Sequence, residues 1–223
     1  VNQNLNRNQL IYFIPIIMLS CITIVFSGER TAFMILLIIF SIYFIFLFKF
    51  YFFKFYKIIL IFFSVSIILF AMPFITFDST QKRMTQDLSS HFSLNVDDSV
   101  YFSLFNTSYL MFLDKPLIGH GTKMFRKKCE DFKKNNYGCN THPHNTYAQI
   151  LSETGIVGFF FIFSLFLYIC FKILKIFFKK KISYIDWQKL SLLICFFITT
   201  SPIILSGNFF NNWLSIIFYT NLS

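Results

Sequence analysis

Charged side chains are scarce in this chain of 223 residues. Only 13% of the residues are Asp, Glu, Lys or Arg, while 56% are hydrophobic. An ordinary soluble domain has about 25% charged residues, so this composition excludes that class and indicates a membrane protein. No cleavage site of a signal peptide is recognisable beside the first apolar run, and we therefore expect that run to be a membrane span.

Long apolar runs are the dominant feature instead. Five of them approach the roughly 20 residues that a helix needs to cross a bilayer: 10–26, 31–48, 58–77, 155–178 and 190–206. Residues 209–219 form a shorter sixth candidate, either re-entrant or truncated, that Asn211 and Asn212 interrupt. The sequence therefore predicts an all-α polytopic membrane protein with five to six transmembrane helices. Three of them lie in residues 1–77, a large extracytoplasmic loop domain occupies 78–154, and C-terminal helices occupy 155–223.

Lysine positions predict the orientation of these spans. Residues 49–57 hold three lysines and residues 172–189 hold six, and short basic loops stay in the cytoplasm. Both segments fall on one side if all five spans form, so residues 78–154 face outward. In that long loop Lys and Arg outnumber the acids. A basic outward surface beside a membrane suits an anionic lipid-linked substrate, with membrane lipids as neighbours, and we expect no nucleic-acid partner.

The densest polar segment stands directly before the fourth apolar run. It contains His142, His144, Asn145, Gln149 and Glu153, and the apolar run follows from Gly155. Ionisable groups beside a bilayer are costly, so a group of them indicates function. Histidine changes charge near neutral pH, which suits proton transfer. This segment is the candidate site.

Two of the five cysteines lie in the outward loop. Cys129 and Cys139 are expected to form a disulfide there, because thiols oxidise outside the cytoplasm, and the bridge would contribute about 3 kcal/mol. A zinc site formed with His142 and His144 is the alternative, although it lacks the close cysteine pair of common zinc motifs. We predict no metal. The other three cysteines lie in predicted spans as small apolar residues.

Three motifs in this chain resemble those of one bacterial family. Residues 139–158 contain His144-Asn145, Leu151 and Glu153-Thr154-Gly155, followed by Gly158, and resemble the His-Asn…Leu…Glu-x-Gly-x-x-Gly signature of the O-antigen ligase and polymerase family. Residues 114–121 resemble its Asp-x-Pro-Leu-x-Gly-x-Gly turn, and residues 27–32 resemble its Ser-Gly-Ser-Arg-Thr box. Together, in this order and on the predicted outer side, the motifs are fairly specific.

The resemblance implies a function in lipopolysaccharide biosynthesis. The family consists of multi-pass glycosyltransferases of the bacterial inner membrane, with the active face in the periplasm. They move a glycan from undecaprenyl diphosphate to an acceptor sugar, on lipid A-core or on another glycan, without metal or other cofactor. Its members are about twice as long and begin with more spans. We therefore expect this chain to be a C-terminal half that is inactive alone.

Elementary chemistry assigns roles to the matching residues. Pro143 suits the first turn of a helix, so the histidines would lie at a helix N-terminus, whose amides attract a diphosphate and whose dipole disfavours imidazolium. His144 is the predicted base, with His142 secondary, and Arg30 the clamp on the leaving diphosphate. Many relatives carry a further arginine near the position of Tyr101, for which Arg83 and Arg126 are substitutes here. The predicted substrate-binding residues are Arg83, Arg126, Lys123, Asn145, Gln149 and Glu153.

Other roles are open for the same residues. Arg30 also fits an interfacial arginine that reaches toward water, and the histidines fit loop residues bonded to the backbone. Glu153 also fits an ion pair with a loop lysine, and the glycines fit close packing and tight turns. A polymerase of the same family is the nearer alternative function. A non-catalytic polysaccharide transporter is the other, but it would carry ionisable groups near mid-membrane.

Overall fold

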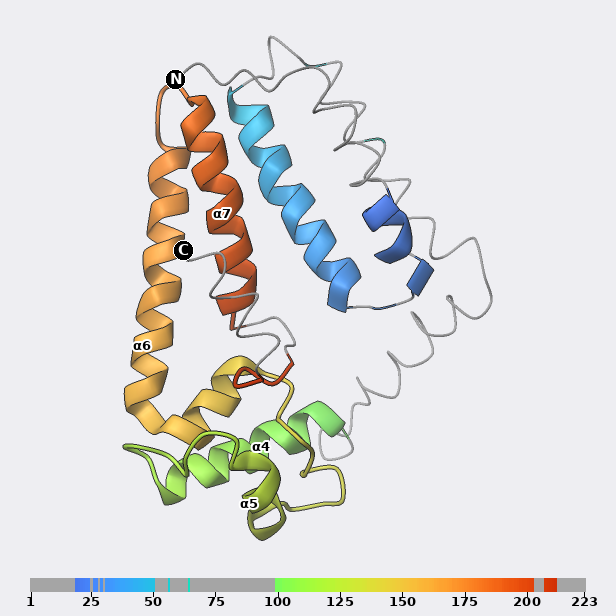
Figure 1. Cartoon of the computed structure of the whole chain (residues 1–223), viewed down its shortest axis with the longest axis vertical. Coiled ribbons are helices and arrows are strands. Elements are labelled where there is room, and N and C mark those ends of the chain that lie inside the picture. The colour runs from blue at the N-terminus through green and yellow to red at the C-terminus, as the bar shows by residue number, and fades with distance from the viewer. Residues whose placement is uncertain are drawn as a thin grey trace. The chain divides into compact units, whose positions relative to one another are not determined.

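The computed structural model describes residues 19–24, 26–27, 29, 31–50, 56, 64, 99–202 and 207–211. Within these ranges every regular element is a helix, which confirms the all-α prediction (Figure 1). The chain forms two compact units, Val1–Leu88 and Ser89–Ser223. Two helices, Thr31–Phe50 and Thr146–Phe177, are long and apolar enough to cross a membrane. The predicted runs 10–26, 58–77 and 209–219 lie wholly or largely outside the described residues, so five to six spans stay a prediction.

The described part of the first unit is built around the helix Thr31–Phe50. Its 20 residues span about 30 Å, the thickness of a hydrocarbon core. The amide of Phe33 donates to the carbonyl of Glu29 at 3.0 Å, so the helical hydrogen bonds begin in the box that starts at Ser27. Ser27 Oγ in turn accepts from the amide of Glu29 at 3.2 Å.

The second unit contains four helices: α4 (Val100–Asp114), α5 (Phe125–Phe132), α6 (Thr146–Phe177) and α7 (Tyr184–Thr200). The short link between α6 and α7 makes them antiparallel neighbours, as Figure 1 shows. Phe166 and Phe197 stack between them with ring centroids 5.5 Å apart. Large side chains on the opposite side of α6, such as Phe161 and Phe171, are 73% and 61% exposed, which suits contact with lipid.

The link between α6 and α7 is fixed by a capping box. Ser183 Oγ accepts from the amide of Asp186 at 3.2 Å, and the Asp186 carboxylate accepts from the amide of Ser183 at 3.0 Å. Lys179 Nζ lies 2.6 Å from the same carboxylate. This lysine, with the Ser183 amide, lowers the pKa of Asp186 to about 2. The predicted cytoplasmic loop is therefore an ordered turn.

Helix α6 is broken at Gly155, which has φ 67° and ψ −163°. The turn at residues 116–121 supplies the hydrogen bonds that the break removes. The amides of His120 and Gly121 donate to the carbonyls of Ser152 and Glu153, at 3.1 and 2.8 Å. After the break, the amide of Ile156 donates to the carbonyl of Pro116 at 2.8 Å. The turn thus caps the end of one helical piece and the start of the next.

Candidate active site at the entry to α6

The entry to α6 is fixed by the side chain of Asn145. Its Oδ1 accepts from the amides of Tyr147 and Ala148 at 2.9 and 3.0 Å, and its Nδ2 donates to the carbonyl of Pro202 at 2.8 Å. The helix therefore begins at Thr146, and the prediction that Pro143 stands in its first turn is wrong. A side-chain cap at Asn145 satisfies two orphan amides, which determines where the helix begins. Those two amides are consequently not free to bind a diphosphate.

The two histidines pack against each other just before this cap. Their ring centroids are 4.2 Å apart, and Tyr101 from α4 meets the His144 ring edge-on at 6.1 Å. His144 Nε2 lies 3.4 Å from Asn140 Nδ2, and His142 Nδ1 lies 2.9 Å from Thr141 Oγ1. Sequence reasoning missed Asn140 and Tyr101 as neighbours of His144. The Asn140 spacing of four residues was visible, but the Tyr101 contact depends on tertiary packing.

His144 has two properties expected of a poised base. Burial lowers the pKa of its imidazole from the ordinary value of 6.5, which favours the neutral ring at neutral pH. Its backbone φ is 56°, in the left-handed region that non-glycine residues seldom adopt. Strained backbone of this kind is concentrated at functional sites, where the surrounding structure holds it.

Glu153 braces the site from inside the protein. It is 1% exposed, its Oε2 accepts from the amide of Lys123 at 2.8 Å, and its Oε1 accepts from the amide of Phe125 at 2.9 Å. These amides lie at the start of α5, where a carboxylate also stabilises the helix dipole. Gln149 Nε2 donates to the same carboxylate at 3.2 Å. Both oxygens of the Glu153 carboxylate thus hold the loop through backbone amides, where the alternative interpretation of Glu153 expected an ion pair with a loop lysine.

Gln149 also connects α6 with residues 207–211. Its Nε2 donates to Asn208 Oδ1 at 2.8 Å, and its Oε1 accepts from the amide of Phe209 at 2.9 Å. Gln149 is 1% exposed, so its amide is enclosed by these bonds. Asn208 Oδ1 additionally accepts from the amide of Phe210 at 3.0 Å. Asn208 and Phe209 therefore contact α6 at the site region.

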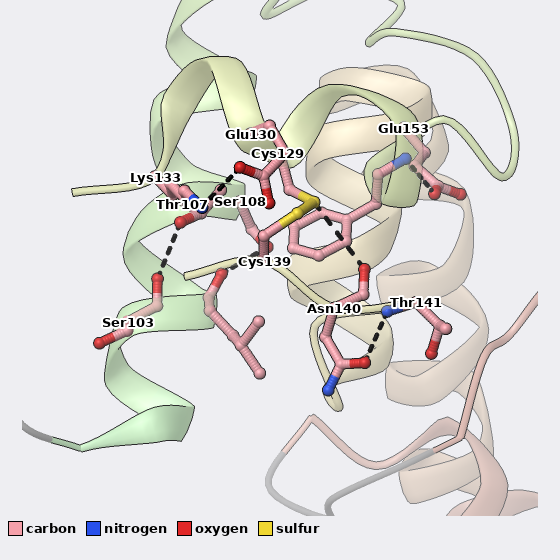
Figure 2. The surroundings of a disulfide bond; sticks show 12 residues. Ser103, Thr107, Ser108, Cys129, Glu130, Lys133, Cys139, Asn140, Thr141 and Glu153 are labelled. Carbon is pink, nitrogen blue, oxygen red and sulfur yellow. Dashed lines mark hydrogen bonds and ion pairs between the residues drawn. A yellow bond between two sulfur atoms is a disulfide. The ribbon is translucent and has the colours of Figure 1, made fainter. Parts of the chain in front are cut away.

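A disulfide joins Cys129 of α5 to Cys139, directly before the segment that carries the histidines (Figure 2). The two Cα atoms are 5.1 Å apart, within the usual range for such a bond. Both sulfur atoms are used in this bond, so they are not available as zinc-binding thiolates. Gly138 lies against Thr107 of α4, where a Cβ atom would come within 2.7 Å of Thr107 Oγ1. The bridge and this contact hold residues 139–141 beside α4.

The predicted basic contacts are only partly described. Arg30 and Arg83 lie outside the described residues, so their predicted roles stay predictions. Arg126 is exposed at the start of α5, and its charge reaches the buried carboxylate of Glu153. Lys123 is half-buried and has φ 61°, which directs its amide to Glu153. His120, in the turn, is hydrogen-bonded through Nε2 to the carbonyl of Met111 at 3.0 Å, and it therefore attaches the turn to α4.

Comparison with known proteins identifies one family. The sequence profile of a family described as O-antigen ligase matches residues 15–163, more than half of the chain. No curated protein and no solved structure matches the chain. The matched range includes the turn at residues 114–121, the histidine pair and the break at Gly155.

Proposed function

Because this chain belongs to the O-antigen ligase family, we propose that it transfers a glycan from undecaprenyl diphosphate to an acceptor sugar. The reaction takes place at the periplasmic face of the bacterial inner membrane. The observation that carries this proposal is the half-buried pair His142 and His144, whose rings pack together at the mouth of a helix long enough to cross the membrane. A histidine kept neutral at this position is suited to act as a base at the membrane surface.

In the proposed reaction His144 takes the proton from a hydroxyl of the acceptor. The hydroxyl oxygen forms a bond with the anomeric carbon of the donor glycan as the bond from that carbon to the diphosphate breaks. Undecaprenyl diphosphate leaves with the electron pair and carries the negative charge. Positive side chains stabilise that charge, and the candidates are Arg30, Arg83, Lys123 and Arg126. No metal is needed in this scheme.

Three of the predicted substrate contacts have a different role in this proposal. Asn145, Gln149 and Glu153 use their polar atoms to cap α6, hold residues 208–209 and hold the start of α5. We therefore propose that they shape the site, while the basic candidates named above meet the lipid diphosphate. Asn140 Nδ2 then holds the His144 ring in place.

Deletion of the gene in its native cell tests the proposed activity. We expect lipid-linked glycan to accumulate on the periplasmic face and the transferred glycan to disappear from the acceptor. If the protein is a ligase, its loss leaves the acceptor without glycan. If it is a polymerase, its loss leaves a single repeat on the acceptor. Accumulation on the cytoplasmic face instead would support a transporter. If the deletion changes neither the lipid-linked glycan nor the glycan on the acceptor, the proposal is contradicted.

Membrane orientation is tested by cysteine labelling in intact cells. We expect a membrane-impermeant reagent to modify the Lys128→Cys variant on α5 and to spare the Lys179→Cys variant, because residue 128 faces the periplasm and residue 179 the cytoplasm. The two positions form a matched pair, since both side chains are exposed in the structure. The variants carry Cys195→Ser, which removes the exposed free thiol. Labelling at position 179 in intact cells would contradict this topology and place the histidines on the cytoplasmic side.

A further inference from the structure

Helix α4 presents a continuous apolar stripe on its outer side. Phe102, Phe105, Tyr109 and Leu113 are 43%, 52%, 50% and 53% exposed, and they recur every three or four residues along one side of the helix. Leu117 and Ile118, in the turn that follows, are 67% and 76% exposed. Apolar side chains that are contiguous to this extent mark a surface that water does not normally cover. The stripe consists of Phe102, Phe105, Tyr109, Leu113, Leu117 and Ile118.

The buried side of α4 is more polar than its exposed side. Ser103, Thr107 and Ser108 are buried there, together with the apolar Leu104 and Met111. Thr107 Oγ1 and Ser108 Oγ donate to carbonyls of α4 itself, at 3.0 and 2.9 Å. Ser103 Oγ accepts from Asn135 at 2.8 Å. Small hydroxyl residues inside and large apolar residues outside are the reverse of a helix in water and fit a helix against lipid.

Helix α5 covers the side of α4 opposite to the stripe. Phe125 and Cys129 of α5 pack against Leu104 and Met111, which lie about 100–160° around the helix from Phe105 and Tyr109. The outer surface of α5 is charged, with Arg126, Lys127, Lys128, Glu130 and Asp131 all exposed. The α4–α5 pair therefore has one apolar face and one charged face. Such a division matches a boundary between lipid and water.

The stripe continues onto the membrane-spanning part of α6. The amide of Val157 donates to the carbonyl of Leu117 at 3.4 Å, which places the end of the stripe beside the start of that helical piece. There, Val157, Phe160 and Phe161 are 63%, 61% and 73% exposed. In Figure 1, α4 lies crosswise to the long piece of α6. A helix with one apolar and one charged face that runs crosswise at the start of a span has the geometry of helices that lie in the membrane interface.

We propose that α4 lies in the outer interface of the bilayer, with the stripe in contact with the upper acyl chains. The occupant of this surface is lipid. Tyrosine is enriched at this depth, which fits the position of Tyr109 in the stripe. Tyr101 on the same helix contacts His144. The anchored helix thus holds the histidine at headgroup level, a consequence that rests on the proposed function, whereas the lipid contact itself does not.

Fluorescence quenching in lipid vesicles tests the proposal on the full chain. The variant Phe105→Trp is made in a background where Trp187→Phe and Trp213→Phe remove the native tryptophans. We expect its emission to be quenched by phospholipids brominated near the top of the acyl chains and to be protected from aqueous iodide. The matched control is Lys127→Trp on the charged face of α5, where iodide quenches and brominated lipid does not.

Two outcomes would overturn the lipid contact. Quenching of position 105 by iodide to the extent seen at position 127 shows a surface in water. Protection from both quenchers, together with cross-linking of Phe105→Cys chains to each other, shows a surface covered by a second copy. Tyr109→Trp repeats the measurement on the same stripe, so that one poorly folded variant does not decide the result. The quenching measurement does not depend on glycan transfer, so its outcome is distinguishable from failure of the proposed activity.

Discussion

Replacing Gly155 by alanine is expected to destabilise the second unit by about 3–5 kcal/mol. The backbone at Gly155 has φ 67° and ψ −163°, a conformation almost restricted to glycine. A Cβ atom there would also meet the backbone of Leu117 and Ile118, including the Ile118 amide nitrogen at 2.7 Å. The broken helix and the turn would be forced apart. The measurement is the midpoint of heat-induced loss of protease resistance in native membranes.

Gly121→Ala is the matched control for that variant. Gly121 has φ 101°, but a Cβ atom would meet only the Met124 side chain at 3.4 Å. Alanine there should lower the stability only by the strain of its left-handed backbone, about 1–2 kcal/mol. An effect at Gly155 no larger than the effect at Gly121 would show that the contact with the turn is unimportant.

The helices were largely predictable because apolar runs are a local signal. The run at 31–48 corresponds to the helix Thr31–Phe50, and the run at 155–178 corresponds to the long piece of α6. The family motifs were also recognisable from sequence. The beginning of α6 was misplaced, because Pro143 and Asn145 are both residues that favour a helix start. The side chain of Asn145 is also bonded to the carbonyl of Pro202, a contact that the sequence does not reveal.

The internal support of the site was not predictable, because its partners are distant in sequence. Glu153 bonds to amides 28 and 30 residues away, and Gln149 bonds to the amide of a residue 60 positions away. The glycines at 119 and 155 were interpreted as a turn and a packing position. In the structure they approach each other's segments, which allows the turn to replace the hydrogen bonds of the broken helix. The sequence alone does not distinguish polar residues that support the site through hydrogen bonds, such as Glu153 and Gln149, from residues that face a substrate.

Replacing His144 by alanine is expected to lower glycan transfer by about 10²–10⁴-fold, the usual contribution of a general base. His142→Ala should cost much less, since His144 is the ring that Asn140 and Tyr101 hold. Transfer is measured in membranes of the native cell with each variant at the chromosomal locus and at equal abundance. Near-normal transfer by His144→Ala, with loss in His142→Ala, would assign the base to the other histidine.

His144→Asn controls for the backbone at this position. Asparagine tolerates the left-handed conformation that φ 56° requires, whereas alanine does not. If the imidazole matters, both variants lose transfer to a similar extent. Transfer retained in His144→Asn alone would show that the backbone conformation, and not the ring, is what the site needs.

The dependence of transfer on pH tests the central claim, a neutral histidine acting as base at the outer face. Burial lowers the pKa of His144, so the neutral ring persists below the ordinary value of 6.5 and is lost only as the pH falls through the lowered value. The account predicts a transfer rate that is constant around neutral pH, falls on the acid side with a midpoint below 6.5, and loses that acid limb in the residual activity of His144→Asn. An acid limb that is unchanged in His144→Asn would contradict it.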